Sequence, residues 1–213
     1  MELKRKTINF LGDSITEGVG ASSPKNCYVS VFEKIAKLKK ANNYGIGGTR
    51  IARKRVPSEV AKYDKDFMSR FPEMDKNADA VVIFGGTNDY GHGDAKLGTF
   101  ESRDPYTFYG ACHILFSGLT EMFCGKPILV VTPIHRAYEN VKDQNGHVLS
   151  DYVEVIREVA KYYSLPILDL YDMGGIQPAV NTAKERLVPD GLHPSDEGHR
   201  MIAERIKNFL ERY

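Results

Sequence analysis

The sequence predicts an α/β protein, a three-layer α/β/α sandwich around a central, mostly parallel sheet of five strands. Three observations lead to this prediction. Short apolar runs alternate with segments of helical periodicity along the whole chain. Two of the runs, Val81–Phe84 and Ile128–Val131, are continuously apolar, as expected of strands covered on both faces. No repeat, low-complexity tract or linker divides the 213 residues, so we expect a single domain over residues 1–213.

The first strand is expected to end in a tight loop. Apolar, β-favouring residues run from Ile8 to Leu11 and stop at Gly12, which is typical of a buried strand followed by a turn. The predicted strands, in order, are Thr7–Leu11, Asn42–Tyr44, Ala78–Phe84, Pro127–Thr132 and Pro166–Leu170. In an open parallel sheet, ligands bind at the carboxyl ends of the strands, so the loops that follow them are the place to look for chemistry.

The helices are predicted from apolar residues that recur at helical spacing. Four such stripes contain Val29, Phe32, Ile35 and Ala36; Phe108, Cys112, Leu115, Leu119 and Met122; Tyr152, Val155, Ile156, Val159 and Tyr163; and Ile202, Ile206, Phe209 and Leu210. Ser195, after Pro194, is expected to cap the last helix. The polar stretches Tyr90–Pro105 and Arg136–Gly146 are expected to be loop excursions that shape a site.

Composition excludes several function classes. The net charge is +1, from 29 basic and 28 acidic residues, so no overall field would recruit nucleic acid or an anionic membrane. The basic cluster Arg50–Arg55 is the local exception. We expect it to be a solvated face, with a patch for anionic substrates as the alternative.

The cysteines and the N-terminal residues indicate in which cellular compartment the protein is expected. Cys27, Cys112 and Cys124 are odd in number and form no Cys-x-x-Cys pair, so buried free thiols are expected. The chain has no apolar signal core at its start and no apolar run near the ~20 residues of a membrane span. We therefore expect a soluble, cytoplasmic protein, unless a signal segment has been removed.

Four short motifs carry the chemistry, and three of them follow predicted strands. Gly12-Asp13-Ser14 follows the first strand, and Gly45-Ile46-Gly47-Gly48 allows close backbone approach to a bound oxygen. Asn88, in Gly85-Gly86-Thr87-Asn88-Asp89, could donate its amide to a developing oxyanion. Asp190 and His193 are three apart in a turn, where a carboxylate can orient an imidazole. Each motif alone is common in structural loops, but together they supply every group that acyl transfer needs.

This ordered set resembles the SGNH hydrolase family, also called GDSL esterases and lipases, from Gly12 to His193. The resemblance implies that Ser14 is the nucleophile, His193 the general base and Asp190 the acid that orients it. It also implies an oxyanion hole made by the N–H groups of Ser14 and Gly48 and the side chain of Asn88, with Gly45 and Gly47 as alternative registers for the glycine. Ile15 stands where the family's short name has Leu, and the Tyr90–Pro105 rim is particular to this chain.

Two more residues are candidates for substrate binding. Asp13 lies beside the nucleophile, where bracing of the loop is the alternative role. His135 follows Thr132-Pro133-Ile134 at a strand end. His92 and Asp94 could suggest a metal pair, but they have no further His or Glu at ligand spacing, so we expect no metal and no cofactor.

The sequence thus favours a serine esterase that hydrolyses small carboxylic esters with short acyl groups, among which acetylated carbohydrate is a candidate. The polar rim and the lack of a long apolar lid argue against long-chain lipids. An acyltransferase would use the same residues. The other alternative is a non-enzymatic, flavodoxin-like module that binds a small ligand in its Gly-rich loops. The oligomeric state stays open.

Overall fold

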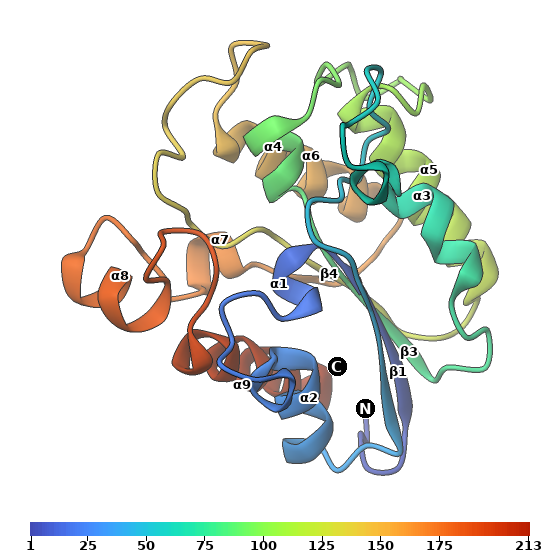
Figure 1. The fold of residues 1–213 in the computed structure, drawn as a ribbon. Helices are drawn as coiled ribbons and strands as arrows, with labels where there is room; N and C mark the ends of the chain where they lie inside the picture. The colour runs from blue at the N-terminus through green and yellow to red at the C-terminus, as the bar shows by residue number, and fades with distance from the viewer.

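The computed structural model describes residues 1–213, and its centre is one sheet of five parallel strands (Figure 1). The strands lie in the order β2-β1-β3-β4-β5. Their bounds are β1 Thr7–Gly12, β2 Lys40–Gly45, β3 Ala80–Phe84, β4 Ile128–Val131 and β5 Ile167–Leu168. This is the strand order of flavodoxin-like folds, which confirms the predicted class.

The strand order reverses between β1 and β3, and this sets the position of the site. The chain leaves β1 toward β2 on one side and then crosses back to β3 on the other, so the loops after β1 and β3 diverge. Gly12, the last residue of β1, is in register with Phe84, the last residue of β3. Doubly wound sheets bind ligands in the crevice at such a reversal.

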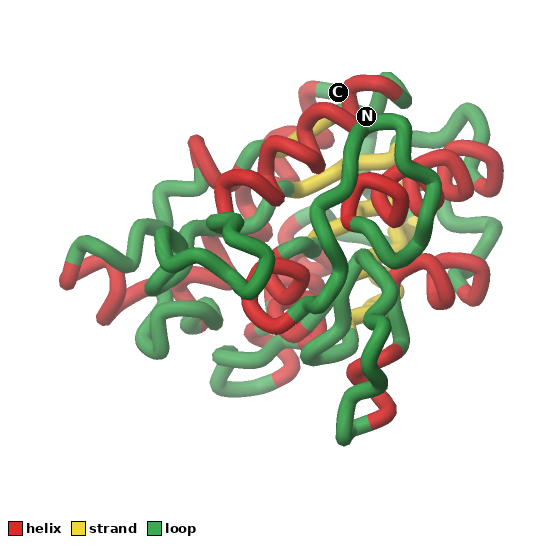
Figure 2. The backbone as a smooth tube through the Cα atoms, turned by 90° about the horizontal axis from the view of Figure 1, so that it is seen from above, coloured by secondary structure: helices red, strands yellow, loops and turns green.

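Helices cover both faces of the sheet, and each face has its own apolar core (Figures 1 and 2). Side chains that alternate along each strand go to opposite faces, so that Val81 and Ile83 join one core and Val82 and Phe84 join the other. The first core packs against α3, α5 and α6, and the second against α2 and α9. These helices are α2 Tyr28–Ile35, α3 Phe67–Arg70, α5 Phe108–Met122, α6 Leu149–Tyr162 and α9 Asp196–Arg212.

Shorter helices lie at the strand ends and between the longer ones. They are α1 Ser14–Glu17, α4 Thr87–His92, α7 Leu170–Met173 and α8 Asn181–Leu187, together with the 3₁₀ turns η1 Pro24–Asn26, η2 Ala61–Asp64 and η3 Phe71–Glu73. Ser195 caps α9 as predicted, since its side chain accepts a hydrogen bond from the Gly198 N–H. No helix has the length and apolar character needed to cross a membrane.

Several predicted segments differ from the structure in their bounds. β2 extends the predicted Asn42–Tyr44 to Lys40–Gly45, and β3 begins at Ala80 instead of Ala78. Two further differences have local reasons. The fifth strand is shorter than Pro166–Leu170, because the Asp169 side chain caps α7 and the chain turns helical at Leu170. The excursion expected at Tyr90–Pro105 begins only at Gly93, because α4 starts directly after β3 and takes in Tyr90–His92. Among the cysteines, Cys27 and Cys112 are buried but Cys124 is exposed, so the prediction for Cys124 was wrong.

Candidate active site

Ser14 is placed at the carboxyl edge of the sheet by a turn that only glycine can make. Gly12 ends β1, and a Cβ there would lie 1.9 Å from Thr16 Oγ1 and 2.8 Å from the Phe84 carbonyl oxygen. Asp13 caps α1 by accepting from the Ile15 N–H at 3.0 Å. Ser14 is therefore the first residue of α1, at the point where the strand order reverses, and it is 7% exposed.

His193 and Asp190 reach Ser14 from a loop 176 positions or more further along the chain. Nε2 of His193 lies 3.1 Å from Ser14 Oγ, and Nδ1 lies 2.7 Å from an oxygen of Asp190. The other Asp190 oxygen accepts from the backbone N–H groups of Leu192 and His193. Because a carboxylate can only accept, the Nδ1–H of His193 points to Asp190, and Nε2 is left to accept the Ser14 proton.

The pKa of Asp190 is lowered even though the carboxyl group is partly buried. Burial of the carboxyl group pushes this pKa upward, but the hydrogen bonds from the His193 imidazole and from the N–H groups of His193 and Leu192 outweigh that effect. Asp190 is thus ionised over the range in which a histidine would become neutral.

Hydrogen bonding distinguishes the three candidate glycines. The N–H of Gly45 donates to the Asn43 side chain, and that of Gly47 donates to a Glu17 oxygen at 2.8 Å. The N–H groups of Gly48 and Ser14 have no acceptor in the chain. Gly48 has φ +76°, and a Cβ there would lie 2.5 Å from the Tyr63 ring, so both conformation and space require glycine. The free donor near Ser14 is therefore at Gly48.

Asn88 borders the same pocket from α4. One of its amide hydrogens is donated to the Thr49 carbonyl at 2.9 Å, which fixes the side chain against the glycine loop. The second amide hydrogen has no acceptor in the chain and remains available. Asn88 is 5% exposed, so this donor lies in a largely water-excluded place.

Three buried charged residues, whose role the sequence analysis missed, hold these loops together. Asp89 accepts from the N–H groups of Ile51 and Ala52 and so ties the glycine loop to α4. Arg70 donates to the Gly12 carbonyl and to the Thr49 hydroxyl. Arg50 donates to the Gly48 carbonyl at 3.3 Å. The only signal in the sequence is that Asp89 lies next to Asn88; nothing local marks either arginine as buried.

The prediction that Arg50–Arg55 forms a solvated face is therefore wrong for Arg50. Its side chain is 3% exposed and donates inward to the Tyr63 carbonyl and to Asp64. Arg53 pairs with Asp66 and Arg55 with Asp104, so these two basic groups are also neutralised locally.

A pocket of about 670 Å³ opens beside Ser14. The candidate groups Ser14, Gly48, Asn88 and His193 all line it. The connection between β2 and α3 supplies several of its lining residues, including Pro57, Val60 and Tyr63. The charged side chains on its walls are two lysines and two glutamates, Lys54, Lys62, Glu17 and Glu59, so the wall charges balance.

The structure does not bring Asp13 or His135 to this pocket. Asp13 is 2% exposed and braces the loop through its cap. Burial raises its pKa to about 6, against the lowering effects of the Ile15 N–H, His193 and Arg70. His135 has Nδ1 2.8 Å from Glu139 and packs its ring on Tyr171, with 4.0 Å between centroids. Neither is placed to touch a substrate at Ser14.

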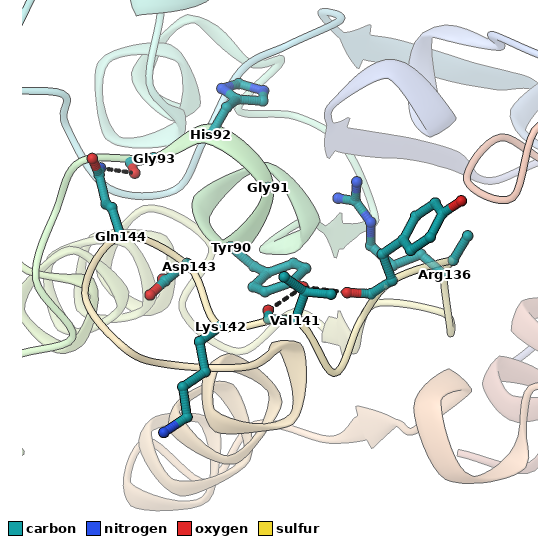
Figure 3. A pocket seen from close by; sticks show the side chains of 11 residues that line it. Tyr90, Gly91, His92, Gly93, Arg136, Val141, Lys142, Asp143 and Gln144 are labelled. Carbon is teal, nitrogen blue, oxygen red and sulfur yellow. Dashed lines mark hydrogen bonds between the residues drawn. The ribbon is translucent and has the colours of Figure 1, made fainter.

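A second pocket, of about 420 Å³, borders the last turn of α4 (Figure 3). Tyr90 anchors it by a hydroxyl placed 2.6 Å from the Tyr138 carbonyl and 2.7 Å from the Val141 carbonyl. Ser14, Gly48, Asn88 and His193 do not line it, whereas His92 lines both pockets. Asp94, the proposed partner of His92 in a metal pair, accepts from the N–H groups of Arg55 and Val56.

Replacement of Asp89 with Asn should change how stability depends on pH. Burial raises the Asp89 pKa from 3.8 to about 7 in the folded chain, against the Ile51 and Ala52 N–H groups and Arg50. The folded state thus holds this proton longer than the unfolded state, and ionisation destabilises the fold as pH rises from about 4 to 7.

We expect the stability of the wild type, relative to Asp89→Asn, to fall across that interval by at most about 4 kcal/mol. The lost hydrogen bond adds an offset that does not vary with pH. Urea unfolding of both proteins at several pH values measures the difference. A difference that stays constant from pH 4 to 7 would show that Asp89 is already ionised at the lower end.

The fold and the position of these groups define the class. A five-stranded parallel sheet in a three-layer sandwich, with its polar loops gathered at the strand reversal, is the architecture of the SGNH hydrolases. A crystal structure of a protein from Lactobacillus plantarum superposes with a TM-score of 0.86 at 30% identity, over 99% of each chain. The acetyl xylan esterase AlAXEase superposes with a TM-score of 0.68 at 24% identity, over 96% of this chain and 99% of its own.

The chain belongs to the GDSL-like lipase/acylhydrolase family, whose model matches residues 10–201. It is also similar to an acetylxylan esterase from Xylanibacter ruminicola, with 35% identity over 83 residues. That match takes in 38% of this chain and 16% of the esterase.

Proposed function

We propose that this protein is a serine esterase that removes short acyl groups, acetyl in particular, from carbohydrates through an acyl-enzyme intermediate. The observation that carries the proposal is the relay at the strand reversal: Ser14 Oγ lies 3.1 Å from Nε2 of His193, whose Nδ1 lies 2.7 Å from Asp190. A hydroxyl, an imidazole and a carboxylate in this order can activate an alcohol as a nucleophile.

The reaction begins when Ser14 Oγ bonds to the ester carbonyl carbon while its proton passes to Nε2 of His193. The carbonyl π electrons move to the oxygen, which the N–H groups of Ser14 and Gly48 and the Asn88 amide stabilise. The tetrahedral intermediate then collapses, and the alcohol leaves with the proton from His193. Asp190 holds the imidazole in the required tautomer and stabilises its charged form.

Water completes the cycle. It attacks the acyl carbonyl while His193 takes its proton, and the second intermediate expels Ser14, which regains its proton. The acid is released and the free enzyme is restored. An acyltransferase would replace this water with an alcohol acceptor, so the products distinguish the two reactions.

Two features favour a short acyl group on a polar alcohol. The pocket walls carry four charged side chains, Glu17, Lys54, Glu59 and Lys62, which would be desolvated against a long alkyl chain. Two similar proteins, one by sequence and one by fold, are named as acetyl xylan esterases. A flavodoxin-like binding module, by contrast, needs no hydrogen-bonded relay at its Gly-rich loops.

A panel of esters tests the proposal. We expect kcat/KM to be highest for p-nitrophenyl acetate and to fall at least tenfold at the octanoate, with acetate released from acetylated xylo-oligosaccharides. In the presence of excess free sugar, product analysis should find acetate rather than a new ester. A preference for octanoate would contradict the short-acyl assignment, and transfer to the sugar would favour the acyltransferase.

A further inference from the structure

His92 lies on the same face of α4 as Asn88. The two residues are four apart in a helix, Thr87–His92, and such residues lie one above the other. Both line the pocket that contains Ser14. His92 also borders the second pocket, and Figure 3 shows its imidazole directed away from Tyr90 and Lys142. It therefore stands about one helical turn beyond the proposed oxyanion donor.

Arg50 determines which nitrogen of His92 carries the proton. Nη1 of Arg50 lies 3.2 Å from Nδ1 of His92. A guanidinium has donors only, so Nδ1 must accept, and in the neutral ring the proton is on Nε2. Loss of solvent around the ring, followed by the Arg50 charge, lowers the His92 pKa and so favours the neutral form. Nε2–H has no hydrogen-bond acceptor in the chain, and His92 is an exposed residue.

Arg50 itself cannot move to another arrangement without breaking several contacts. The same Nη1 donates to the Gly48 carbonyl, and Nη2 donates to the Tyr63 carbonyl at 2.9 Å and lies 3.3 Å from Asp64. The guanidinium is thus held by the glycine loop and by the connection between β2 and α3. It fixes His92 and the loop of Gly48 relative to each other.

We propose that His92 is a specificity-determining residue, whose Nε2–H donates a hydrogen bond to a neutral oxygen next to the ester in the alcohol part of the substrate. This inference rests on the proposed esterase function. The two lysines and two glutamates of the pocket walls cancel, which favours a neutral oxygen over a carboxylate or phosphate. A hydroxyl vicinal to the ester, as in a partly acetylated sugar, has this chemistry.

Two esters that differ by one hydroxyl test the proposal. They are cyclohexyl acetate and trans-2-hydroxycyclohexyl acetate, and each kcat/KM is divided by the rate of alkaline hydrolysis of that ester to remove its intrinsic reactivity. We expect the wild type to prefer the hydroxy ester about three- to tenfold, as one neutral hydrogen bond allows. The preference is the ratio of the two corrected kcat/KM values for the same protein. A variant that is less active on both esters to the same extent therefore keeps the same ratio.

Three variants complete the test. His92→Leu should bring the ratio close to one, whereas His92→Gln, whose amide can accept from Arg50 and still donate, should keep most of it. His147→Leu is the matched control, because His147 lies beside Asp151 at the start of α6 and outside the pocket, and it should keep the wild-type ratio.

A wild type that treats both esters alike, or a His92→Leu variant that keeps the full preference, would overturn the assignment of His92. These results would leave the esterase proposal standing, because both esters would still be hydrolysed. If neither ester is hydrolysed and a fluorophosphonate does not label Ser14, the esterase proposal fails, and this inference fails with it.

Discussion

Replacement of Ser14 with Ala is expected to lower kcat/KM on p-nitrophenyl acetate by about 10,000-fold or more. Removal of the nucleophile eliminates the acyl-enzyme route, and the loss should be of the size found when a member of such a relay is deleted. The side chain makes one hydrogen bond, to His193, so the fold should be retained. Steady-state kinetics together with the melting temperature of both proteins measure the effect.

Ser117→Ala is the matched control for this substitution. Ser117 is an exposed serine on α5 whose hydroxyl donates to the His113 carbonyl of its own helix, so its loss should leave turnover within about twofold. Wild-type turnover in Ser14→Ala would show that another group performs the chemistry.

The second large effect is expected for Asn88→Ala, with a fall in kcat of about 100- to 1000-fold and a small change in KM. Loss of one oxyanion donor typically costs about 3 to 4 kcal/mol in the transition state and little in the ground state. The substitution also leaves the Thr49 carbonyl without its partner, so about 1–3 kcal/mol of stability should be lost as well. Kinetics well below the melting temperature separate the two effects.

Asn88→Asp makes this prediction sharper. The carboxylate keeps the shape but supplies no donor, and its charge would face the developing oxyanion, so activity should fall at least as far as in Asn88→Ala. If either variant retains kcat within fivefold of the wild type, Asn88 does not donate to the oxyanion.

The alternation of strands and helices could be predicted from the sequence, because a strand that is buried on both faces of the sheet is apolar at every position. Val81–Phe84 and Ile128–Val131 are apolar throughout, and they form β3 and β4. The ends of elements were less predictable, since they depend on single polar contacts. The cap of Asp169 on α7, for example, shortens the last strand.

The candidate site was predictable in its members but not in its details. The order of the four motifs identified Ser14, Asn88, Asp190 and His193, which the fold brings together. The resemblance already favoured Gly48, with Gly45 and Gly47 as alternatives. The structure adds the reason against Gly47, whose N–H donates to Glu17, 30 positions away. The buried states of Arg50 and Arg70 arise from distant carbonyl groups and leave no local pattern.

The structure does not place His135 at the site, and the reason is related. Its position after β4 suggested that it would face the site, but a carboxylate four residues on, at Glu139, and the ring of Tyr171 hold the imidazole elsewhere. The Asp13 side chain is likewise engaged in a structural contact, because it accepts a hydrogen bond from the Ile15 N–H in the turn that positions Ser14. A position at the end of a strand places a residue near the site, but local contacts determine the direction of its side chain.

The most direct measurement is the reaction of the intact protein with a fluorophosphonate, followed by mass spectrometry of the whole chain and of its peptides. We expect one adduct, on Ser14, formed at least 100-fold more slowly when His193 is replaced with Ala, because the imidazole must remove the hydroxyl proton. An adduct on another serine, or a labelling rate that does not depend on His193, would contradict the relay.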